Sequence, residues 1–448
     1  MKQTLDAVAF FEQDYVNQAS YDNLRKIASL VDGLKNASRK VIYTVLEKNI
    51  YDLTKVSQLS AKAGEFADYL HGSLDGVVVT LAQDFLGTNQ MPLLKKKGNF
   101  GTRAIQDASA SRYIFACGSD HLKDYFLSLD RPNLQTQYFE GAKIEPRYYV
   151  PEVPILLVNG SKGVSSGFAQ NILARPANEI KRILRKFVRS ENPKVLDEIN
   201  QIAPLIDGFH GTVVRDREFP EVYKWLFTTD FLINKNEITL LDLPYGSDLR
   251  SYLQFLDKLE EDKKIKSYED LTDGDNFKFV VKFDRKTDLT KIDVVKLFKL
   301  QVSVTENFTC IDQNNKILQA VAPADILQEF VKVKLEYMQK RKSKMLEDLR
   351  IKKSKDESML WFIQNIIDGK IEFRKTTSNQ LNEIFERNQL FKVDGDTQLG
   401  FGYLHRVPAG KMVQEEVQAL ETKIKQTKEE IQKIDGMSIY ELWNETLK

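Results

Sequence analysis

The chain has 448 residues and a formal net charge of +1; 42% of its residues are hydrophobic and 29% are charged, and no apolar run is long enough to span a membrane. Two cysteines and four histidines exclude a disulfide framework and a metal site built from these two residue types alone. The start of the chain lacks an apolar signal region, so we expect a globular cytoplasmic protein of roughly three domains.

Basic residues are concentrated in the N-terminal part, although the net charge is close to zero. The main ones are Lys35, Arg39, Lys40, Lys95, Lys96, Lys97, Arg103 and Arg112. Acidic residues gather later, between 257 and 275. Alone, the three consecutive lysines would be a solvated loop, but they stand directly before a glycine-rich segment. The distribution predicts a local basic face, which is typical of nucleic-acid binding.

Residues 1–24 carry a short apolar pattern and are predicted to form an arm or helix that docks elsewhere. Three helices are expected next, at Ala37–Lys48, Val56–Tyr69 and Leu74–Phe85. Glycines then cluster before a strand at Tyr113–Cys117. Helices followed by a glycine-rich wing are typical of a helix-turn-helix variant, whose helices can lie along a duplex.

The texture changes after about residue 146. Pro154–Val158 is predicted to be a buried strand because it is a short apolar run bounded by turn signals. Asn178–Val188 has the spacing of an amphipathic helix, and strands are expected at Ile238–Leu241 and Phe277–Val281. This part is predicted to be an α+β domain.

The last third is predicted to be helical. A helix that opens at Pro323 and runs to Asp368, with Gly369 as its C-cap, would be about 65 Å long. The return helix carries apolar or small residues at alternating steps of four and three: Val413, Val417, Leu420, Ile424, Thr427, Ile431 and Ile434. This spacing predicts the seam of a helical hairpin, and Ser438–Glu441 has the form of a capping box.

The dipeptide Arg112-Tyr113 stands at the mouth of a short apolar run, downstream of the basic glycine loop Gly98–Arg103. Free tyrosine has a pKa of about 10 and is a poor nucleophile at neutral pH. A neighbouring guanidinium favours the phenolate and can hold phosphate oxygens in a bidentate pair. A tyrosine that attacks phosphate requires at least such a neighbouring cation. An isolated Arg-Tyr dipeptide, however, is more often part of a packed strand.

Four ordered segments resemble the active-site region of the type IIA DNA topoisomerases. They are Arg25–Lys35 with Ser38–Val41, Tyr69–Leu94, Gly98–Phe115, and Val158–Phe168. The resemblance covers nearly the whole chain. Length and content are most similar to bacteriophage members of the family, in which this breakage-reunion part is a separate subunit.

The resemblance implies an α+β multidomain fold. Its parts would be an arm at 1–24, a winged-helix DNA-cleavage domain at 25–145, a tower domain at 146–318, and a long helical coiled-coil arm with a C-terminal gate at 319–448. The compact module at about 369–410 would meet its twin in a homodimer. The dimer would act on double-stranded DNA, in the bacterial host cytoplasm for a phage protein.

The resemblance also implies the roles of individual residues. Tyr113 would attack a DNA phosphodiester and form a 5′-phosphotyrosyl link, and Arg112 would stabilise the developing charge. His71 matches the second histidine of the family's Tyr-His-His-Gly pattern and would contact the phosphate, whereas Leu70 replaces the first histidine.

The DNA contacts implied by the resemblance are Arg25, Lys35 and Arg39 on backbone phosphates, and Val164. Asn36 stands where the family has proline after the lysine. Val164 takes the place of an isoleucine that wedges between bases; the alternative is a valine packed in the core beneath the tower.

No Glu plus Asp-x-Asp set appears in the strand-loop context of a Toprim metal site, and no glycine-rich ATP motif is present. We therefore expect no metal site here, with Mg²⁺ and ATP bound by a large ATPase/Toprim partner subunit.

Three other hypotheses compete with this one. Gly163-Val164-Ser165-Ser166-Gly167 also matches the nucleophile elbow of serine hydrolases, and His210 and His405 follow it in the chain. A DNA-binding architectural protein of the same fold, without cleavage, is the second alternative, and the intact Arg112-Tyr113 pair argues against it. A meiotic-type strand-break enzyme is the third, but that family carries Toprim in the same chain.

Overall fold

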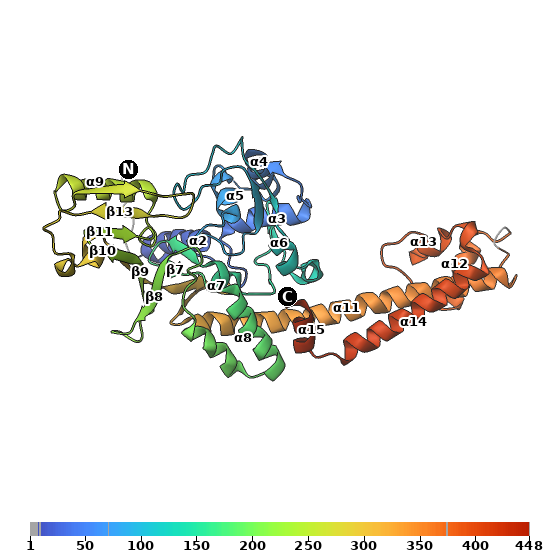
Figure 1. Ribbon diagram of the computed structural model, residues 1–448. Helices are drawn as coiled ribbons and strands as arrows, with labels where there is room; N and C mark the ends of the chain where they lie inside the picture. Colours follow the sequence, from blue (N-terminus) through green and yellow to red (C-terminus); the bar gives the residue numbers. More distant parts are fainter. Residues whose placement is uncertain (1–7, 9, 70, 373–374, 448) are drawn as a thin grey trace. The chain divides into compact units, whose positions relative to one another are not determined.

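The computed structural model describes residues 8, 10–69, 71–372 and 375–447 and separates into two compact units (Figure 1). Unit 1 comprises residues 1–335 and 444–448, and unit 2 comprises residues 336–443. Each unit is described by itself below.

The N-terminal part of unit 1 is mostly helical. Its helices are η1 (Phe10–Tyr15), α2 (Val16–Lys26), α3 (Asn36–Glu47), α4 (Val56–Phe66), α5 (Asp75–Ala82), α6 (Asp120–Tyr125) and η2 (Ser128–Asn133). The helices α3, α4 and α5 confirm the three that the hydrophobic spacing predicted, although α4 and α5 end earlier than expected. The predicted arm includes η1 and most of α2; its residues 1–7 and 9 lie outside the described part.

A three-stranded antiparallel sheet with the order β1-β3-β2 accompanies these helices. Its strands are β1 (Thr54–Lys55), β2 (Leu94–Lys97) and β3 (Phe115–Gly118), and a hairpin of β4 (Gln137–Phe139) and β5 (Ala142–Ile144) follows. The strand expected from Tyr113 is present but begins at Phe115, because residues 111–113 form a turn. That turn leaves the candidate tyrosine just outside the sheet.

A strand was predicted for the apolar run at Pro154–Val158, but the run forms the short helix α7 (Ile155–Asn159). Its burial was predicted correctly, since the four apolar residues of α7 are buried. A short apolar run has no periodicity that separates a buried strand from a buried helix, which is why the prediction was wrong. Gly33 lies against this helix at φ +68°, where a Cβ would come within 2.5 Å of the Leu156 nitrogen.

The chain continues through a hairpin and an amphipathic helix. The elements are β6 (Ser161–Val164), β7 (Ala169–Ile172), α8 (Ala177–Ser190) and η3 (Pro193–Gln201). The helix α8 confirms the one expected at Asn178–Val188, and its apolar face is buried. It packs against η3.

Two antiparallel sheets follow, with the orders β14-β9-β8 and β10-β11-β13-β12. The elements are β8 (Gly211–Asp216), β9 (Lys224–Thr229), β10 (Phe231–Asn234), β11 (Glu237–Leu240), α9 (Leu249–Glu261), β12 (Ser267–Asp270), β13 (Phe279–Lys282), η4 (Leu289–Lys291), α10 (Val294–Leu297), β14 (Gln301–Thr305), β15 (Phe308–Ile311) and β16 (Ile317–Ala320). β11 and β13 confirm the two strands expected here. Ile238 of β11 and Phe279 of β13 share one hydrophobic core with Leu256 of α9.

The long helix α11 (Pro323–Ile367) begins in unit 1 and continues into unit 2. Its first turns belong to unit 1 because Ile326, Leu327 and Phe330 are buried there. The division between the two units falls after residue 335, and the domain boundary predicted at residue 318 stays a prediction. The further separation of 25–145 from 146–318 stays a prediction.

Unit 2 is a helical hairpin with a small module at its turn. Besides α11 it contains α12 (Ser378–Arg387), η5 (Gln398–Gly400), α13 (Gly402–His405), η6 (Ala409–Lys411), α14 (Gln414–Gly436) and most of α15 (Ile439–Thr446). Five predicted seam residues of α14 are buried: Val417, Leu420, Ile424, Thr427 and Ile434. The antiparallel pairing places Lys428 Nζ 3.3 Å from the Glu357 carboxylate.

The capping box predicted after the return helix is also present. The Ser438 nitrogen donates to the Glu441 carboxylate at 2.7 Å, and the Glu441 nitrogen donates to Ser438 Oγ at 3.1 Å. The module predicted at 369–410 includes residues 373 and 374, which lie outside the described part. Its role as a dimer gate stays a prediction.

Candidate functional site

The glycine loop before the candidate tyrosine depends on two glycines. Gly98 has a φ of +105°, and a Cβ there would come within 2.9 Å of the Ile114 side chain. Gly101 has a φ of +86°, and a Cβ would come within 2.3 Å of the Gln106 carbonyl oxygen. Only glycine satisfies both the left-handed backbone and the close approach. The loop is thereby folded tightly against the segment that carries Tyr113.

Tyr113 lies at the end of the turn and projects into solvent, with 67% of its surface exposed. The Arg112 Cζ lies 4.9 Å from the centre of the Tyr113 ring. The turn is anchored to the start of α4, because Val56 N donates to the Ile114 carbonyl at 2.9 Å and Ser57 N donates to the Ser111 carbonyl at 3.2 Å. An exposed phenol beside an exposed guanidinium, on an anchored turn, is accessible to a polymeric phosphodiester.

The segment that carries His71 is connected to the same turn through Asp75. Burial alone would raise the pKa of Asp75, but hydrogen bonds from Ser111, Ser60 and Ser73 lower it. His71 itself is exposed, and its Nε2 lies 2.5 Å from the Tyr21 hydroxyl on α2. The helix α2 thus positions the predicted histidine. Leu70 lies outside the described residues.

Val164 occupies the tip of the β6–β7 hairpin, and 72% of its surface is exposed. A valine packed in the core would be covered, so this exposure contradicts the alternative of a packing residue beneath the tower. The hairpin turn is closed by a hydrogen bond from Ser165 N to the Phe168 carbonyl at 2.9 Å. The side chain is free to meet a ligand, which is what a wedge requires.

The helix α2 holds this hairpin through Asp22. One carboxylate oxygen of Asp22 accepts from Ser165 Oγ at 3.0 Å, from Ser166 N at 3.1 Å and from Ser166 Oγ at 3.0 Å. The Lys26 ammonium, 2.8 Å away, and then the two serine hydroxyls lower the pKa of Asp22 to about 2. Asp22 therefore stays a carboxylate throughout the physiological range, and the hairpin remains attached to α2.

Lys35 also contacts the same hairpin. Its Nζ donates to the Lys162 carbonyl at 2.7 Å, and partial burial lowers its pKa. The charge thus lies close to the Val164 hairpin, where it can meet a phosphate. Arg25 is half-buried, with its guanidinium 5.6 Å from the Tyr21 ring centre. Both placements agree with the predicted phosphate contacts without testing them.

Arg39 is not placed as the sequence predicted. Its Nε and Nη2 donate to the two oxygens of Asp32 at 2.7 and 2.9 Å, and both side chains are buried. Burial alone would lower the pKa of Arg39, but the Asp32 carboxylate raises it. Asp32 also accepts from the backbone nitrogen of Tyr149 at 3.0 Å. The guanidinium is therefore occupied inside the protein, and we revise its expected phosphate contact to a structural role.

Lys40 and Arg103 require the same correction. Lys40 Nζ lies 2.9 Å from a Glu145 carboxylate oxygen, and it donates to the Ala67 carbonyl. Arg103 reaches both oxygens of Asp242, at 2.8 and 2.9 Å, and is buried. It joins the glycine loop to the sheets of residues 211–282. Sequence spacing gave no sign of these carboxylate partners, because each lies more than a hundred residues away in the chain.

The lysine run on β2 behaves as the alternation of a strand requires. Lys95 and Lys97 are exposed, whereas Lys96 is partly covered and lies 2.5 Å from an Asp84 oxygen. Two of the three charges are thus available on the surface beside the glycine loop. The prediction that they contact DNA stays open.

The serine-hydrolase alternative finds no support in the geometry of Ser165. Its Oγ donates to the Asp22 carboxylate rather than to an imidazole. His405 belongs to unit 2, where its Nε2 lies 2.7 Å from Asn382 Oδ1 and burial lowers its pKa. The backbone nitrogen of His210 donates to Asp242 at 2.7 Å. The glycine-flanked serines serve the hairpin turn.

Among the residues that the structure describes, no three His, Cys, Asp or Glu side chains come together as ligands for a metal ion. In the same part of the chain, no helix is long and apolar enough to span a membrane.

Sequence reasoning missed two residues that position the site: Tyr21 and Asp22. Neither belongs to a recognisable motif, because their importance comes from contacts with segments 50 and 144 positions away.

Comparisons with known proteins agree on one family. The family model for the A subunits of DNA gyrase and topoisomerase IV matches residues 25–448. The chain is 30% identical over 98% of its length to "DNA topoisomerase 2, mitochondrial" of Dictyostelium discoideum and 29% identical over 84% to human "DNA topoisomerase 2-alpha". It covers 34% and 25% of those two proteins, so it spans about a third of the curated relatives or less.

A solved structure agrees as well. The crystal structure of the Plasmodium falciparum topoisomerase II DNA-binding, cleavage and re-ligation domain matches with a TM-score of 0.87 and 26% identity. The match covers 98% of this chain and 63% of the solved one. The similarity therefore extends through both units rather than through one motif.

Proposed function

Because this chain belongs to the family of the DNA gyrase and topoisomerase IV A subunits, we propose that it is the DNA breakage-reunion part of a type II DNA topoisomerase. The observation that carries the proposal is the exposed Tyr113, with the Arg112 guanidinium 4.9 Å from its ring centre on an anchored turn. The relatives named DNA topoisomerase 2 and the solved cleavage domain support the same reaction.

In the proposed reaction, Tyr113 Oη attacks a DNA phosphorus in line and loses its proton. The bond from phosphorus to the 3′ oxygen breaks, and that oxygen takes up a proton. The product is a 5′-phosphotyrosyl link and a free 3′-hydroxyl. The reverse attack by this hydroxyl releases the phenol and reseals the strand, so the bond energy is conserved. Arg112 would stabilise the charge on the pentacovalent phosphorus.

His71 would act beside this phosphate rather than as a nucleophile. Its exposed imidazole, held by the Tyr21 hydroxyl at 2.5 Å, can donate to a phosphate oxygen. Val164 would enter the stack between two bases and bend the duplex, since its hairpin is held by Asp22 and Lys35. The same helix, α2, thus supports both the histidine and the wedge.

At a finer level, we propose a protein like the medium subunit of T-even-type bacteriophage topoisomerases. Two copies would form a homodimer through the module at 369–410 and cut opposite strands, so that a second duplex passes through the break. Mg²⁺ and ATP would be bound by a large ATPase/Toprim subunit, and the enzyme would act in the bacterial host cytoplasm. The match of the family model to residues 25–448 supports the assignment of breakage and reunion to this chain.

Trapping a covalent adduct tests the proposal. The full chain is mixed with a large topoisomerase subunit, Mg²⁺ and end-labelled duplex, and the reaction is stopped with denaturant. We expect label attached to this chain through a 5′ phosphate, and no adduct when the large subunit is left out. If the chain binds DNA but never yields an adduct, the architectural alternative replaces the proposal.

Replacing Val164 tests the wedge. We expect Val164→Ala to reduce DNA bending and to slow cleavage about tenfold, or about 1.4 kcal/mol, because alanine is too short to unstack a base step. The melting temperature should stay within about 1 °C, since the side chain is exposed. Bending is measured by energy transfer between dyes at the duplex ends.

Val214→Ala is the matched control, because Val214 is another exposed strand valine. It should change neither bending nor cleavage. Normal bending by Val164→Ala would show that the hairpin tip does not enter the stack.

A further inference from the structure

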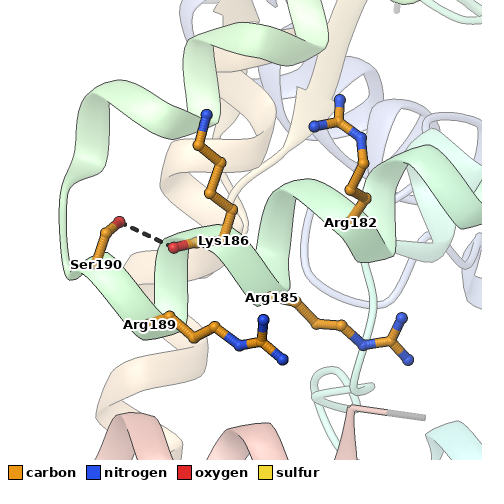
Figure 2. A pocket seen from close by; sticks show the side chains of 5 residues that line it. All are labelled: Arg182, Arg185, Lys186, Arg189 and Ser190. Atoms are coloured by element: carbon orange, nitrogen blue, oxygen red, sulfur yellow. Dashed lines mark hydrogen bonds between the residues drawn. The ribbon is translucent and has the colours of Figure 1, made fainter.

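The helix α8 carries an excess of positive charge that the cleavage reaction does not use. Its fourteen residues include five cations and one acid: Lys181, Arg182, Arg185, Lys186 and Arg189 against Glu179. The formal net charge of the whole chain is only +1, so this helix is a local extreme. Four of the cations and Ser190 line a cavity of about 400 Å³ on the surface of unit 1 (Figure 2).

The four cations form two rows with different partners. In the first row, Arg182 lies 2.9 Å from Glu179 and 3.2 Å from Glu198, and Lys186 pairs with the same Glu198. These carboxylates from α8 and η3 already neutralise much of the row. A phosphate would have to compete with them, so this row is a poor receptor.

The second row consists of Arg185 and Arg189, and no carboxylate is paired with it in the part of the chain that the structure describes. Arg185 donates to the Leu447 carbonyl at 3.1 and 3.3 Å, which orients the guanidinium without neutralising it. For Arg189, neither an ion pair nor a hydrogen bond of the guanidinium is found among the described residues. Figure 2 shows the two guanidinium groups on the same side of α8.

The spacing of this row suits a phosphodiester chain. Residues four apart on a helix differ in height by about 6 Å, which is the rise of about two phosphates along one strand of a duplex. Guanidinium groups bind phosphate oxygens in a bidentate manner and stay charged at any physiological pH. An open row of two cations therefore fits a polymer of phosphates better than a single small anion.

The row lies away from the cleavage segment. Tyr113 is anchored to the start of α4, and in Figure 1 α4 and α8 stand at opposite sides of unit 1. A duplex bound at Tyr113 would therefore leave this surface free. We propose that Arg185 and Arg189 bind the backbone of a second duplex, a contact that rests on the proposed function and adds a site to it.

A two-duplex binding experiment tests this site. The full chain is captured on an immobilised duplex, and the affinity for a second, labelled duplex is measured over a range of salt concentrations. For Arg185→Gln with Arg189→Gln, we expect the slope of log affinity against log salt to become shallower by about 1.8, because two phosphate contacts are lost. Arg185→Lys with Arg189→Lys, which keeps both charges, should restore most of it.

Arg182→Gln with Lys186→Gln is the matched control, since it removes two charges from the same helix. It should leave the slope unchanged, and binding of the first duplex should be equal in all variants. The proposal would be overturned if the double variant Arg185→Gln with Arg189→Gln had the same salt slope as the wild type. It would also be overturned if both glutamine double variants made the salt slope shallower by the same amount. A glutamate-rich peptide that binds at this row while the second duplex does not would overturn it as well, because the ligand would then be an acidic polypeptide.

Failure of the proposed α8 site can be distinguished from failure of the proposed function. If the chain does not cleave DNA, even the wild type yields no covalent adduct with the large subunit present. If only the α8 site is wrong, the adduct forms at the wild-type level in every variant, and only the second-duplex measurement fails.

Discussion

Tyr113→Phe should reduce covalent adduct formation to background, a loss of at least roughly 10⁴-fold, because the substitution removes the attacking oxygen and nothing else. Relaxation and decatenation should disappear with it. DNA affinity should be retained, and the free energy of unfolding should change by less than about 0.5 kcal/mol, because the hydroxyl belongs to an exposed ring. Denaturant-trapped adduct and a melting curve measure the two sides of this expectation.

Tyr138→Phe is a close control, since Tyr138 is 70% exposed in β4 and outside the cleavage turn. It should form adduct at the normal rate. A residual adduct in Tyr113→Phe would assign the nucleophile to another residue. A loss of adduct in both variants would indicate that the assay responds to something other than the attacking oxygen.

Arg39→Gln should destabilise unit 1 by about 3–5 kcal/mol, which corresponds to a fall in melting temperature of roughly 10 °C. The reason is Asp32, which is fully buried and would lose the two guanidinium hydrogen bonds at 2.7 and 2.9 Å. The backbone donors of Leu34 and Tyr149 would remain, but they do not neutralise the carboxylate. Calorimetry of the full chain provides the measurement.

Two further variants separate stability from DNA contact. Combining Arg39→Gln with Asp32→Asn should recover part of the loss, because the buried charge is removed. Arg25→Gln, on a half-buried arginine without a carboxylate partner in the described residues, should leave the melting temperature unchanged and make the salt slope of DNA binding shallower by about 0.9. Normal stability of Arg39→Gln with a shallower slope would restore the phosphate contact predicted from the sequence.

Local patterns in the sequence predicted much of the secondary structure. Apolar spacing predicted the helices α3, α8 and α14, because one face of each helix must be buried. The core residues of these helices are buried as expected. The strand predicted at Pro154–Val158 was wrong, because burial on all sides removes the periodicity that separates a strand from a helix. The seam of the helical hairpin in unit 2 could be predicted because it depends on a repeating pattern of apolar residues along α14 rather than on individual contacts.

The sequence by itself predicted the chemical class of the candidate site, since Arg112, Tyr113, His71 and Val164 lie in ordered segments that resemble one family. Tertiary structure decided which charges are available to a ligand. Arg39, Lys40 and Arg103 are cations like Lys35 in the sequence, yet Asp32, Glu145 and Asp242 bury and neutralise them. The energy of a buried ion pair depends on the distance between two side chains and on their exclusion from water, and neither quantity is written in the local sequence.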